Sequence, residues 1–302
     1  MQIIKGVTQV LLSTSAALAA FAALAQPDWD NIEIVTTPVT DGIFMLSSAA
    51  GGNIGLSVGD DGVLLIDDQF AQISSKINDA IDSVSTEDIR FVLNTHWHFD
   101  HVGDNANMAS QGAVIVAHNA VRSRMQVGQT VPAFAMDIPP APTQALPVVT
   151  FADSMALHFN GHTMELTHTD AAHTDGDSFV FFLEANVLHT GDLFWKGMYP
   201  LVDGSSGGSA QGMVDAVARV ITLTDEDTLV IPGHGPLGNK SDLEAYHDML
   251  QTVVSRISRQ KNQGMSLEQV VAAKPTAEYD SKWGQGLFTG DAWVGVIYGT
   301  VE

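Results

Sequence analysis

The sequence of 302 residues is long enough for one large α/β domain and too short for two full ones. Its 45% hydrophobic and 16% charged residues exclude a disordered chain. The absence of cysteine excludes disulfides, thiolate zinc sites and cysteine nucleophiles, so any metal site must use His, Asp and Glu. The formal net charge of −22 repels polyanions, which argues against nucleic acid and anionic lipid as partners.

The N-terminus has the layout of a secretory signal peptide. Lys5 supplies one positive charge, residues 16–25 are unbroken apolar sequence, and the run ends in the small-x-small pattern Ala23-Leu24-Ala25. The run is shorter than the roughly 20 residues of a membrane-spanning helix. We therefore expect residues 1–25 to be cleaved and the protein to be periplasmic or secreted, without membrane attachment. Residues 26–302 are expected to form a single domain with a C-terminal helical tail.

Strands and helices alternate along the first half of the mature chain. Short apolar runs predict strands at residues 53–58, 62–66, 91–93 and 113–116. Apolar side chains spaced by three and four residues predict a helix between Phe70 and Val84. Residues 126–147 contain several prolines, which disfavour a helix and predict a surface loop or lid over a cleft.

The second half repeats this order. The apolar runs predict an antiparallel meander of residues 148–151, 155–159 and 163–167, and further strands at 179–183, 186–189 and 228–231. Helices are expected at residues 211–223 and after the capping boxes at 241–244 and 266–269. Each half thus ends in a strand followed by a histidine loop, which suggests two similar α/β halves packed sheet to sheet. Large aromatic residues of the tail, residues 274–302, are expected to pack against the domain.

Four metal-ligand side chains follow the strand at residues 91–93 within a six-residue stretch: His96, His98, Asp100 and His101. His96 and His98 alternate, so they lie on one side of an extended segment. A solvated polar loop does not explain the bulky apolar Trp97 and Phe99 between them. The stretch therefore predicts a metal site.

Further ligands must come from elsewhere, because a catalytic zinc typically has three protein ligands and a water. His173 lies in a turn between two predicted strands. Asp192 and His234 each follow a strand directly, beside glycine. If these strand ends meet at one sheet edge, all seven side chains converge there.

The H-x-H-x-D-H motif, the single His, the Asp after a strand and the Gly-His-Gly resemble the metallo-β-lactamase superfamily in order and spacing, over about residues 32–250. The resemblance implies an α/β fold, the four-layer αββα sandwich, and two Zn²⁺ per chain. It places the first zinc on His96, His98 and His173, and the second on Asp100, His101 and His234, with Asp192 bridging the two metals. It also implies a hydroxide shared by the metals that attacks a carbonyl, with Asp100 as the catalytic residue that orients this nucleophile.

The ligands do not separate the activities of this superfamily. The predicted export favours β-lactam hydrolysis and hence a role in antibiotic resistance. Only 68 residues follow His234, too few for the glutathione-binding domain of glyoxalase II, and the negative charge argues against a nuclease. Against a β-lactamase, the largest subclass has Cys where this chain has Asp192, which resembles the thioesterase pattern instead.

We therefore predict an exported zinc hydrolase of a small cyclic amide or ester, with β-lactams as the leading substrates. A thioesterase or lactonase of the glyoxalase II type, a mono-iron enzyme similar to persulfide dioxygenases and a non-catalytic metal-binding or solute-binding protein stay as alternatives. Trp97, Trp195, Lys196 and Tyr199 are the predicted substrate contacts. Lys196 would bind a lactam carboxylate, although its position four residues after Asp192 departs from the family's register.

Overall fold

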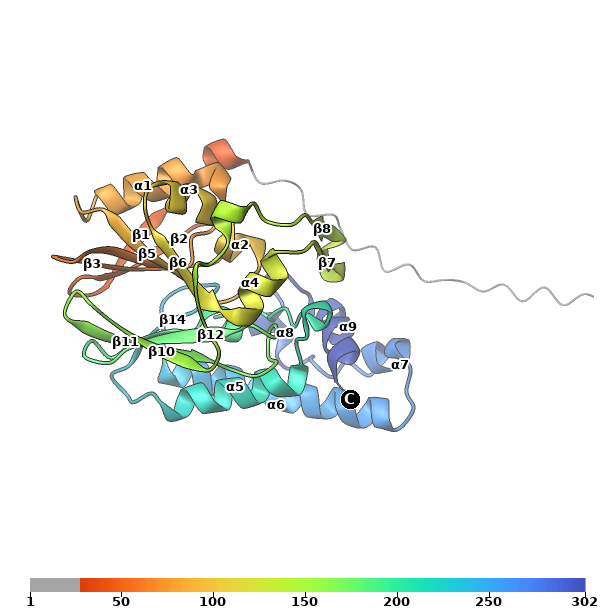
Figure 1. Ribbon diagram of the computed structural model, residues 1–302. Coiled ribbons are helices and arrows are strands. Elements are labelled where there is room, and N and C mark those ends of the chain that lie inside the picture. The colour runs from red at the N-terminus through yellow and green to blue at the C-terminus, as the bar shows by residue number, and fades with distance from the viewer. Residues whose placement is uncertain (1–27, 302) are drawn as a thin grey trace, which may run out of the picture.

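The computed structural model describes residues 28–301 (Figure 1). The predicted signal peptide, residues 1–25, lies outside the described residues, so its cleavage and the domain boundary at residue 26 stay predictions. Across residues 28–301, no helix combines the length and the apolar character that crossing a membrane requires.

The chain forms two large β-sheets, each with strands in an order that brings distant segments together. The first sheet consists, in spatial order, of β1 (Val35–Thr40), β2 (Ile43–Ser47), β3 (Ile54–Gly59), β4 (Gly62–Ile66), β5 (Ile89–Asn94), β6 (Val114–His118) and β9 (Val149–Phe151). The second consists of β10 (Ser154–Phe159), β11 (His162–His168), β12 (Ser178–Phe182), β13 (Val187–His189), β14 (Leu229–Ile231) and β15 (Gly238–Asn239). A separate hairpin pairs β7 (Gln129–Val131) with β8 (Met136–Ile138).

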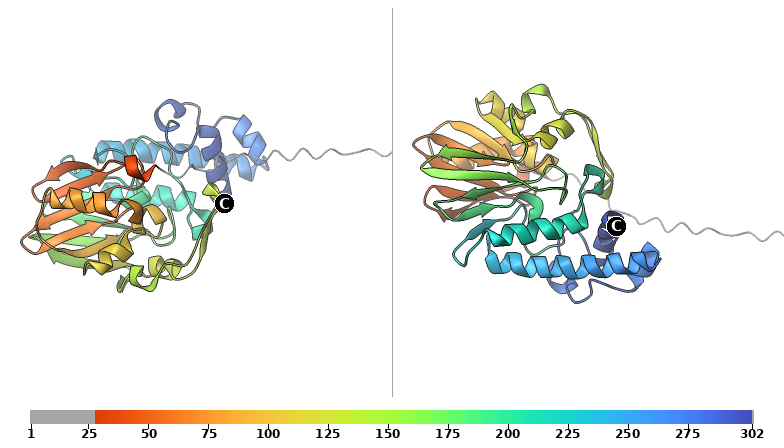
Figure 2. Two further views of the ribbon diagram at one scale, coloured as in Figure 1. Left: turned by 90° about the horizontal axis from the view of Figure 1, so that it is seen from above. Right: turned by 60° about the horizontal axis from the view of Figure 1, so that its bottom comes forward.

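Helices cover the outer face of each sheet, and the two sheets face each other (Figures 1 and 2). On the side of the first sheet lie α1 (Ser74–Asp82), α2 (Phe99–Val102), α3 (Asn105–Ser110) and α4 (Asn119–Met125). On the side of the second sheet lie α5 (Ala210–Thr222) and α6 (Lys240–Asn262), followed by α7 (Leu267–Ala272), α8 (Asp280–Trp283) and α9 (Gly290–Thr300). The predicted α/β class and αββα layering are confirmed.

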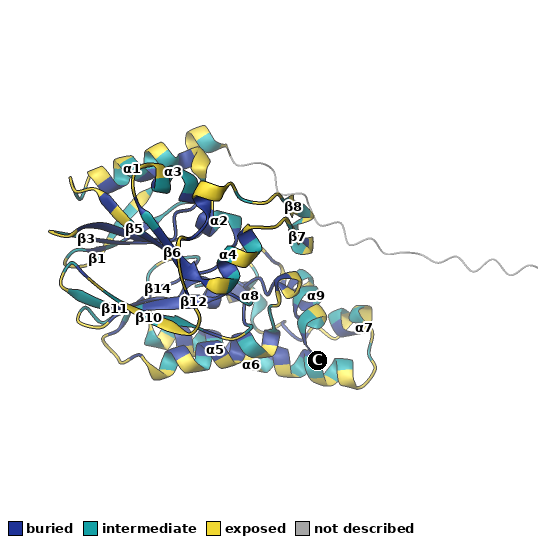
Figure 3. Cartoon of the chain, viewed as in Figure 1, coloured by how far each residue is buried: buried dark blue, intermediate teal, exposed yellow. Residues whose placement is uncertain are grey.

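The central strands are buried on both faces because each face contacts another layer. Along β4, Leu64 and Ile66 belong to the core between the sheets, whereas Val63 and Leu65 pack towards α1, as the two-residue period of a strand requires. In Figure 3 these inner strands are dark blue, and the outward faces of the helices carry the yellow, exposed residues. The two sheets therefore hold their strand ends in fixed relative positions.

One predicted helix start is confirmed and one is displaced. Ser266 and Gln269 form the predicted capping box of α7. The box of α6 is formed by Asn239 and Asp242, so the prediction of residues 241–244 is wrong by two residues. The reason is that β15 ends at Asn239, and this residue caps the helix as the chain leaves the strand.

The predicted meander is wrong in its first strand. β9 pairs in parallel with β6 in the first sheet, whereas β10 and β11 form the predicted antiparallel pair in the second sheet. The pattern of apolar residues fixes which faces a strand buries but does not identify its partner. Strands β1, β2, β7, β8 and β15 were not predicted, and β7 and β8 lie inside the predicted loop of residues 126–147.

The tail packs against the domain, as predicted. Trp283, Phe288 and Trp293 are buried, and Tyr298 is partly buried against the same core. The ring of Trp293 stacks on that of Tyr199 with centroids 4.3 Å apart, and its Nε1 donates to the carbonyl oxygen of Pro200 at 2.7 Å.

Candidate metal centre

The seven predicted ligands meet at one edge of the sandwich, where several strands end. His96 and His98 follow β5, and Asp100 and His101 lie in the short helix α2. Residues from the second sheet approach from the opposite side. They are His173 between β11 and β12, Asp192 in a 3₁₀ turn after β13, and His234 after β14. The predicted convergence of these side chains is therefore what the structure shows.

The first group of ligand atoms comes from His96, His98, His173 and Asp192, whose donor atoms lie within 4.8 Å of one another. His173 Nε2 lies 2.8 Å from His98 Nδ1. Asp192 Oδ2 lies 3.2 Å from His173 Nε2 and 3.6 Å from His96 Nε2. All four side chains are buried.

The second group consists of Asp100, His101 and His234, also within 4.8 Å of one another. The other oxygen of Asp192, Oδ1, lies 3.1 Å from His101 Nε2 and 3.4 Å from His234 Nε2. Asp100 Oδ2 lies 3.6 Å and 3.4 Å from the same two nitrogens. Asp192 therefore presents one oxygen to each group, which is the arrangement of a bridging carboxylate.

Two buried carboxylates that the sequence analysis missed contact ligand histidines, each at the ring nitrogen that points away from the centre. His98 Nε2 lies 3.0 Å from Asp203 Oδ2, and His101 Nδ1 lies 2.8 Å from Asp67 Oδ2. These contacts leave His98 Nδ1 and His101 Nε2 to face the centre. Asp67 directly follows β4, so its position at a strand end was a signal available in the sequence. Asp203 has no comparable signal.

The remaining buried histidines are held in the same way. His173 Nδ1 contacts the carbonyl oxygen of Leu201 at 2.8 Å, and His96 Nδ1 contacts Thr95 Oγ1 at 3.0 Å. In both rings Nε2 is then the nitrogen that faces the centre. Partners of this kind fix the tautomer and orientation of metal-binding imidazoles.

Burial and mutual proximity shift the ionisation of these groups. Burial lowers the pKa of His173 to about 4 and that of His96 well below its ordinary value, so both rings are neutral and have a lone pair to offer a metal. Burial alone would raise the pKa of Asp192, but His101 and His234 hold it well below the usual range. The pKa of His101 is raised, against the effect of burial, by Asp192 and Asp100. A metal cation would take the place of that proton.

The side chains fit a metal pair. Two buried atoms, His96 Nε2 and Asp192 Oδ1, have no hydrogen-bond partner among the described residues. A buried polar atom without a partner destabilises the folded protein unless a ligand binds to it. The backbone also approaches closely, because a Cβ atom on Gly52 would collide with the His101 ring and one on Gly233 with Asp192 Oδ1. Imidazole and carboxylate donors without sulfur suit zinc, and equally other divalent ions of its class.

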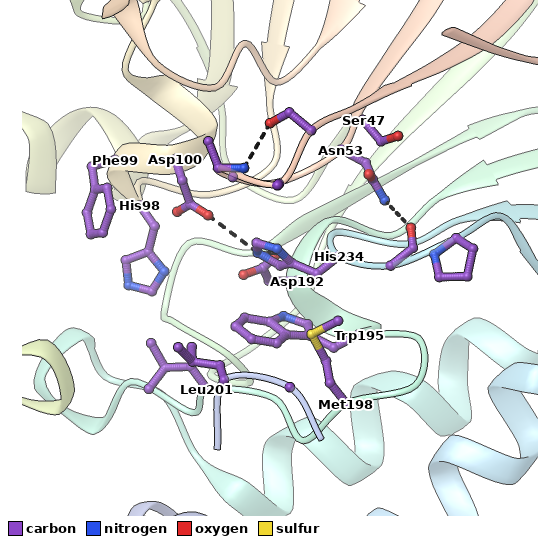
Figure 4. Close-up of a pocket in the computed structure, with 18 of the residues that line it drawn as sticks. Ser47, Asn53, His98, Phe99, Asp100, Asp192, Trp195, Met198, Leu201 and His234 are labelled. Atoms are coloured by element: carbon purple, nitrogen blue, oxygen red, sulfur yellow. Dashed lines mark hydrogen bonds and ion pairs between the residues drawn. The ribbon is translucent and has the colours of Figure 1, made fainter. Parts of the chain in front are cut away.

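A cleft of about 630 Å³ opens over the centre (Figure 4). Asp100, Asp192 and His234 form its polar floor, and Trp195, Met198 and Leu201 form an apolar wall. The Trp195 ring lies 4.2 Å from the His234 ring, centroid to centroid. Of the four predicted substrate contacts, Trp195 is the one that lines the cleft, and no described Lys or Arg does.

The other three predicted contacts do not line this cleft. Trp97 is buried outside this cleft, in the wall of a smaller neighbouring cavity, and its Nε1 donates to Ser206 Oγ at 3.1 Å. Lys196 Nζ contacts Asp242 Oδ2 at 2.7 Å and the Leu237 carbonyl oxygen at 2.8 Å, at the start of α6. Tyr199 is fully buried, because the C-terminal tail covers it, and its hydroxyl contacts Asp280 at 2.9 Å.

Comparison with known proteins gives one family match and several structures of similar fold. Residues 49–234 match the model of the metallo-beta-lactamase superfamily. A similar protein, an uncharacterized protein of Aquifex aeolicus (strain VF5), is 29% identical over 143 residues, which is 47% of this chain and 66% of that relative, slightly less than two thirds of its length.

Solved structures of similar fold include a metallo-beta-lactamase from Pontibacter korlensis, at 18% identity and a TM-score of 0.60, covering 72% of this chain and 99% of that one. The DIM-1 metallo-beta-lactamase has 15% identity and a TM-score of 0.59, covering 73% of this chain and 99% of that one. The inverting sec-alkylsulfatase Pisa1 from Pseudomonas sp. has 16% identity and a TM-score of 0.64, covering 88% of this chain and 50% of that one. At these identities the likeness establishes a shared fold.

Proposed function

Because the chain belongs to the metallo-β-lactamase superfamily, whose members are generally hydrolases, we propose that it is an exported two-zinc hydrolase of cyclic esters or amides. One observation carries the proposal. The two oxygens of Asp192 face two separate groups of ligands, 3.2 Å from His173 Nε2 on one side and 3.1 Å from His101 Nε2 on the other. A site for a single metal needs only one of these groups.

When bound, the zinc pair would lower the pKa of a shared water towards about 7 and polarise the scissile carbonyl. The protein's own groups position the reactants. Asp100 lines the cleft and its side chain is 18% exposed, so it can accept a hydrogen bond from the attacking water and hold its proton. Asp192, at 2% exposure, is held in place between the histidines. Trp195 and Met198 shield the reacting carbonyl from bulk solvent.

The described side chains of the cleft supply no cation for a substrate carboxylate. No described Lys or Arg lines it, and Lys196, the residue predicted to bind a lactam carboxylate, is engaged with Asp242. Only the proposed zinc ions would then compensate the carboxylate of a β-lactam, without help from a protein cation. Among the proposed substrates, uncharged lactones fit this lining better than β-lactam antibiotics, and thioesters fit it if they lack a charged carrier group.

Hydrolysis and metal content of the purified protein test the proposal together. We expect about two zinc ions per chain and turnover of simple lactones above that of nitrocefin, a chromogenic β-lactam. Nitrocefin turnover above that of every lactone would instead show that the protein is primarily a β-lactamase. One iron per chain without hydrolysis would contradict the proposal and support an oxidoreductase. Tight metal binding without turnover of any ester, thioester or lactam would indicate a binding protein.

Export is tested separately, by fractionation of expressing bacterial cells. We expect the protein in the periplasmic or secreted fraction, with an N-terminus at residue 26. Protein found in the cytoplasm with residues 1–25 intact would contradict this part of the proposal and leave the catalytic part unchanged.

A further inference from the structure

A second cavity of about 210 Å³ lies beside the metal-centre cleft, between α2, the end of α4 and the loop of residues 126–147. Its walls are apolar, formed by residues such as Val102, Ala106, Met125 and Ile138. The charged residue of the lining, Arg124, is neutralised because its guanidinium contacts both oxygens of Asp175 at 2.6 Å. The lining also includes Gln129, whose amide contacts Arg124, so the cavity offers a ligand mainly apolar contacts.

Phe99 lies between this cavity and the metal-centre cleft. Its side chain is half-buried and forms part of the wall of both the cleft and the second cavity. In the sequence it stands between two ligands, His98 and Asp100, and Figure 4 shows its ring at the far end of the cleft beyond them. The two cavities therefore adjoin at this ring.

Exposed apolar residues border both the cleft and the second cavity. Val127, 54% exposed, lies on the second cavity, and Leu287, 38% exposed, lies on the metal-centre cleft. Exposed large apolar side chains that border a cavity mark a surface that binds apolar ligands. The two cavities, which share Phe99, therefore both present apolar surface at the cleft's edge.

We infer that the second cavity binds the aliphatic tail of the substrate, while its ester ring lies at the metal centre. This inference rests on the proposed function and names its substrate class: an uncharged lactone with an alkyl chain. Hydrolysis breaks the ring C–O bond, joins the oxygen of water to the carbonyl carbon and gives a hydroxy acid that keeps the tail. The volume holds roughly seven methylene groups, if each takes about 30 Å³, the share of one water molecule.

γ-Butyrolactone and its homologues with γ-alkyl tails of one to ten carbons test the inference on the metal-loaded protein. Burial of one methylene predicts an increase in kcat/KM of about fourfold per carbon, with a plateau near seven carbons. Because the tail contacts are made equally in the ground state and the transition state, the gain in kcat/KM is expected from a lower KM, with kcat nearly constant.

Ala141→Trp fills the cavity from the surface loop. Ala141 lines only the second cavity, so this variant is expected to lose at least tenfold in kcat/KM for the octyl lactone and nothing for γ-butyrolactone. Gln144→Trp is the matched control, because Gln144 is exposed on the same loop and lines neither the cleft nor the second cavity. If Ala141→Trp does not fold, Ala106→Leu fills the cavity from α3.

Binding of the corresponding γ-alkyl pyrrolidinones, measured by calorimetry, separates the tail site from the reaction, because these five-membered lactams are hydrolysed far more slowly. Tail-dependent binding that is lost in Ala141→Trp and kept in Gln144→Trp supports the tail site even if no lactone is hydrolysed, in which case only the proposed function fails. Hydrolysis or binding that is independent of tail length, or a tail preference that survives in Ala141→Trp, overturns the inference.

Discussion

Two buried carboxylates each contact one ligand histidine at the ring nitrogen that points away from the centre. Replacing these carboxylates tests whether the centre contains two separable metal sites. Asp203 supports His98 in the first ligand group, and Asp67 supports His101 in the second. We predict that Asp203→Asn weakens zinc binding by the first group only, and that Asp67→Asn weakens zinc binding by the second group only.

The size of the effect follows from the contacts of each carboxylate. Loss of such a partner lowers metal affinity by about 10–100-fold. The two oxygens of Asp67 accept from the Thr95 backbone N–H at 2.7 Å and from His101 at 2.8 Å, so the NH₂ group of an asparagine must face one of these donors. Asp203 is in the same position, because its Oδ1 accepts from the Ser205 N–H at 3.0 Å. We therefore expect about 100-fold in each case, or about 2.8 kcal/mol.

The assay is a zinc competition against a chromophoric chelator, in backgrounds that keep only one ligand group. His234→Ala disables the second group, and His173→Ala disables the first. In the His234→Ala background, Asp203→Asn should reduce zinc affinity about 100-fold and Asp67→Asn should leave it unchanged. The His173→Ala background should give the reverse. Equal losses from both substitutions in one background would refute the assignment of each carboxylate to its own site.

Three further predictions concern burial around the centre. Burial raises the pKa of Asp104 to about 6, so the folded state binds more protons than the unfolded state and stability falls as pH rises from about 4 to about 6. Asp104→Asn should therefore raise the Tm of the metal-free protein more at pH 7 than at pH 4, and an equal change at both pH values would contradict this. Trp293→Ala should lower the free energy of unfolding by about 3–5 kcal/mol in urea titrations, because the ring is fully buried, and a loss below about 1 kcal/mol would show that the tail is dispensable. Gly52→Ala should abolish turnover and zinc binding by the second group, because the added methyl group collides with His101. Gly295→Ala, in open space on α9, is the control and should change neither. Full activity of Gly52→Ala would be evidence against the close approach of the backbone to His101.

The ligand set was predictable from sequence because its members stand in short, distinctive contexts. His96, His98 and His101 share one six-residue stretch, and His234 lies between two glycines directly after a strand. Local sequence also predicted β4, whose run of residues 62–66 is apolar throughout because both of its faces are buried.

The surroundings of the ligands were less predictable because they depend on contacts between distant segments. Lys196 was expected in the cleft, but the start of α6 places Asp242 within 2.7 Å of its Nζ. Tyr199 was expected in the cleft as well, but α9 stacks Trp293 on its ring. Asp203 reaches His98 across 105 residues of sequence. No local pattern of residues encodes these three contacts.

A crystal structure of the zinc-loaded protein, with anomalous scattering measured at the zinc edge, tests the central claim most directly. The account predicts two peaks about 3.5–4 Å apart, one among His96, His98 and His173 and one among Asp100, His101 and His234, with Asp192 between them. A single peak at either group, or two peaks that do not share Asp192, would contradict it.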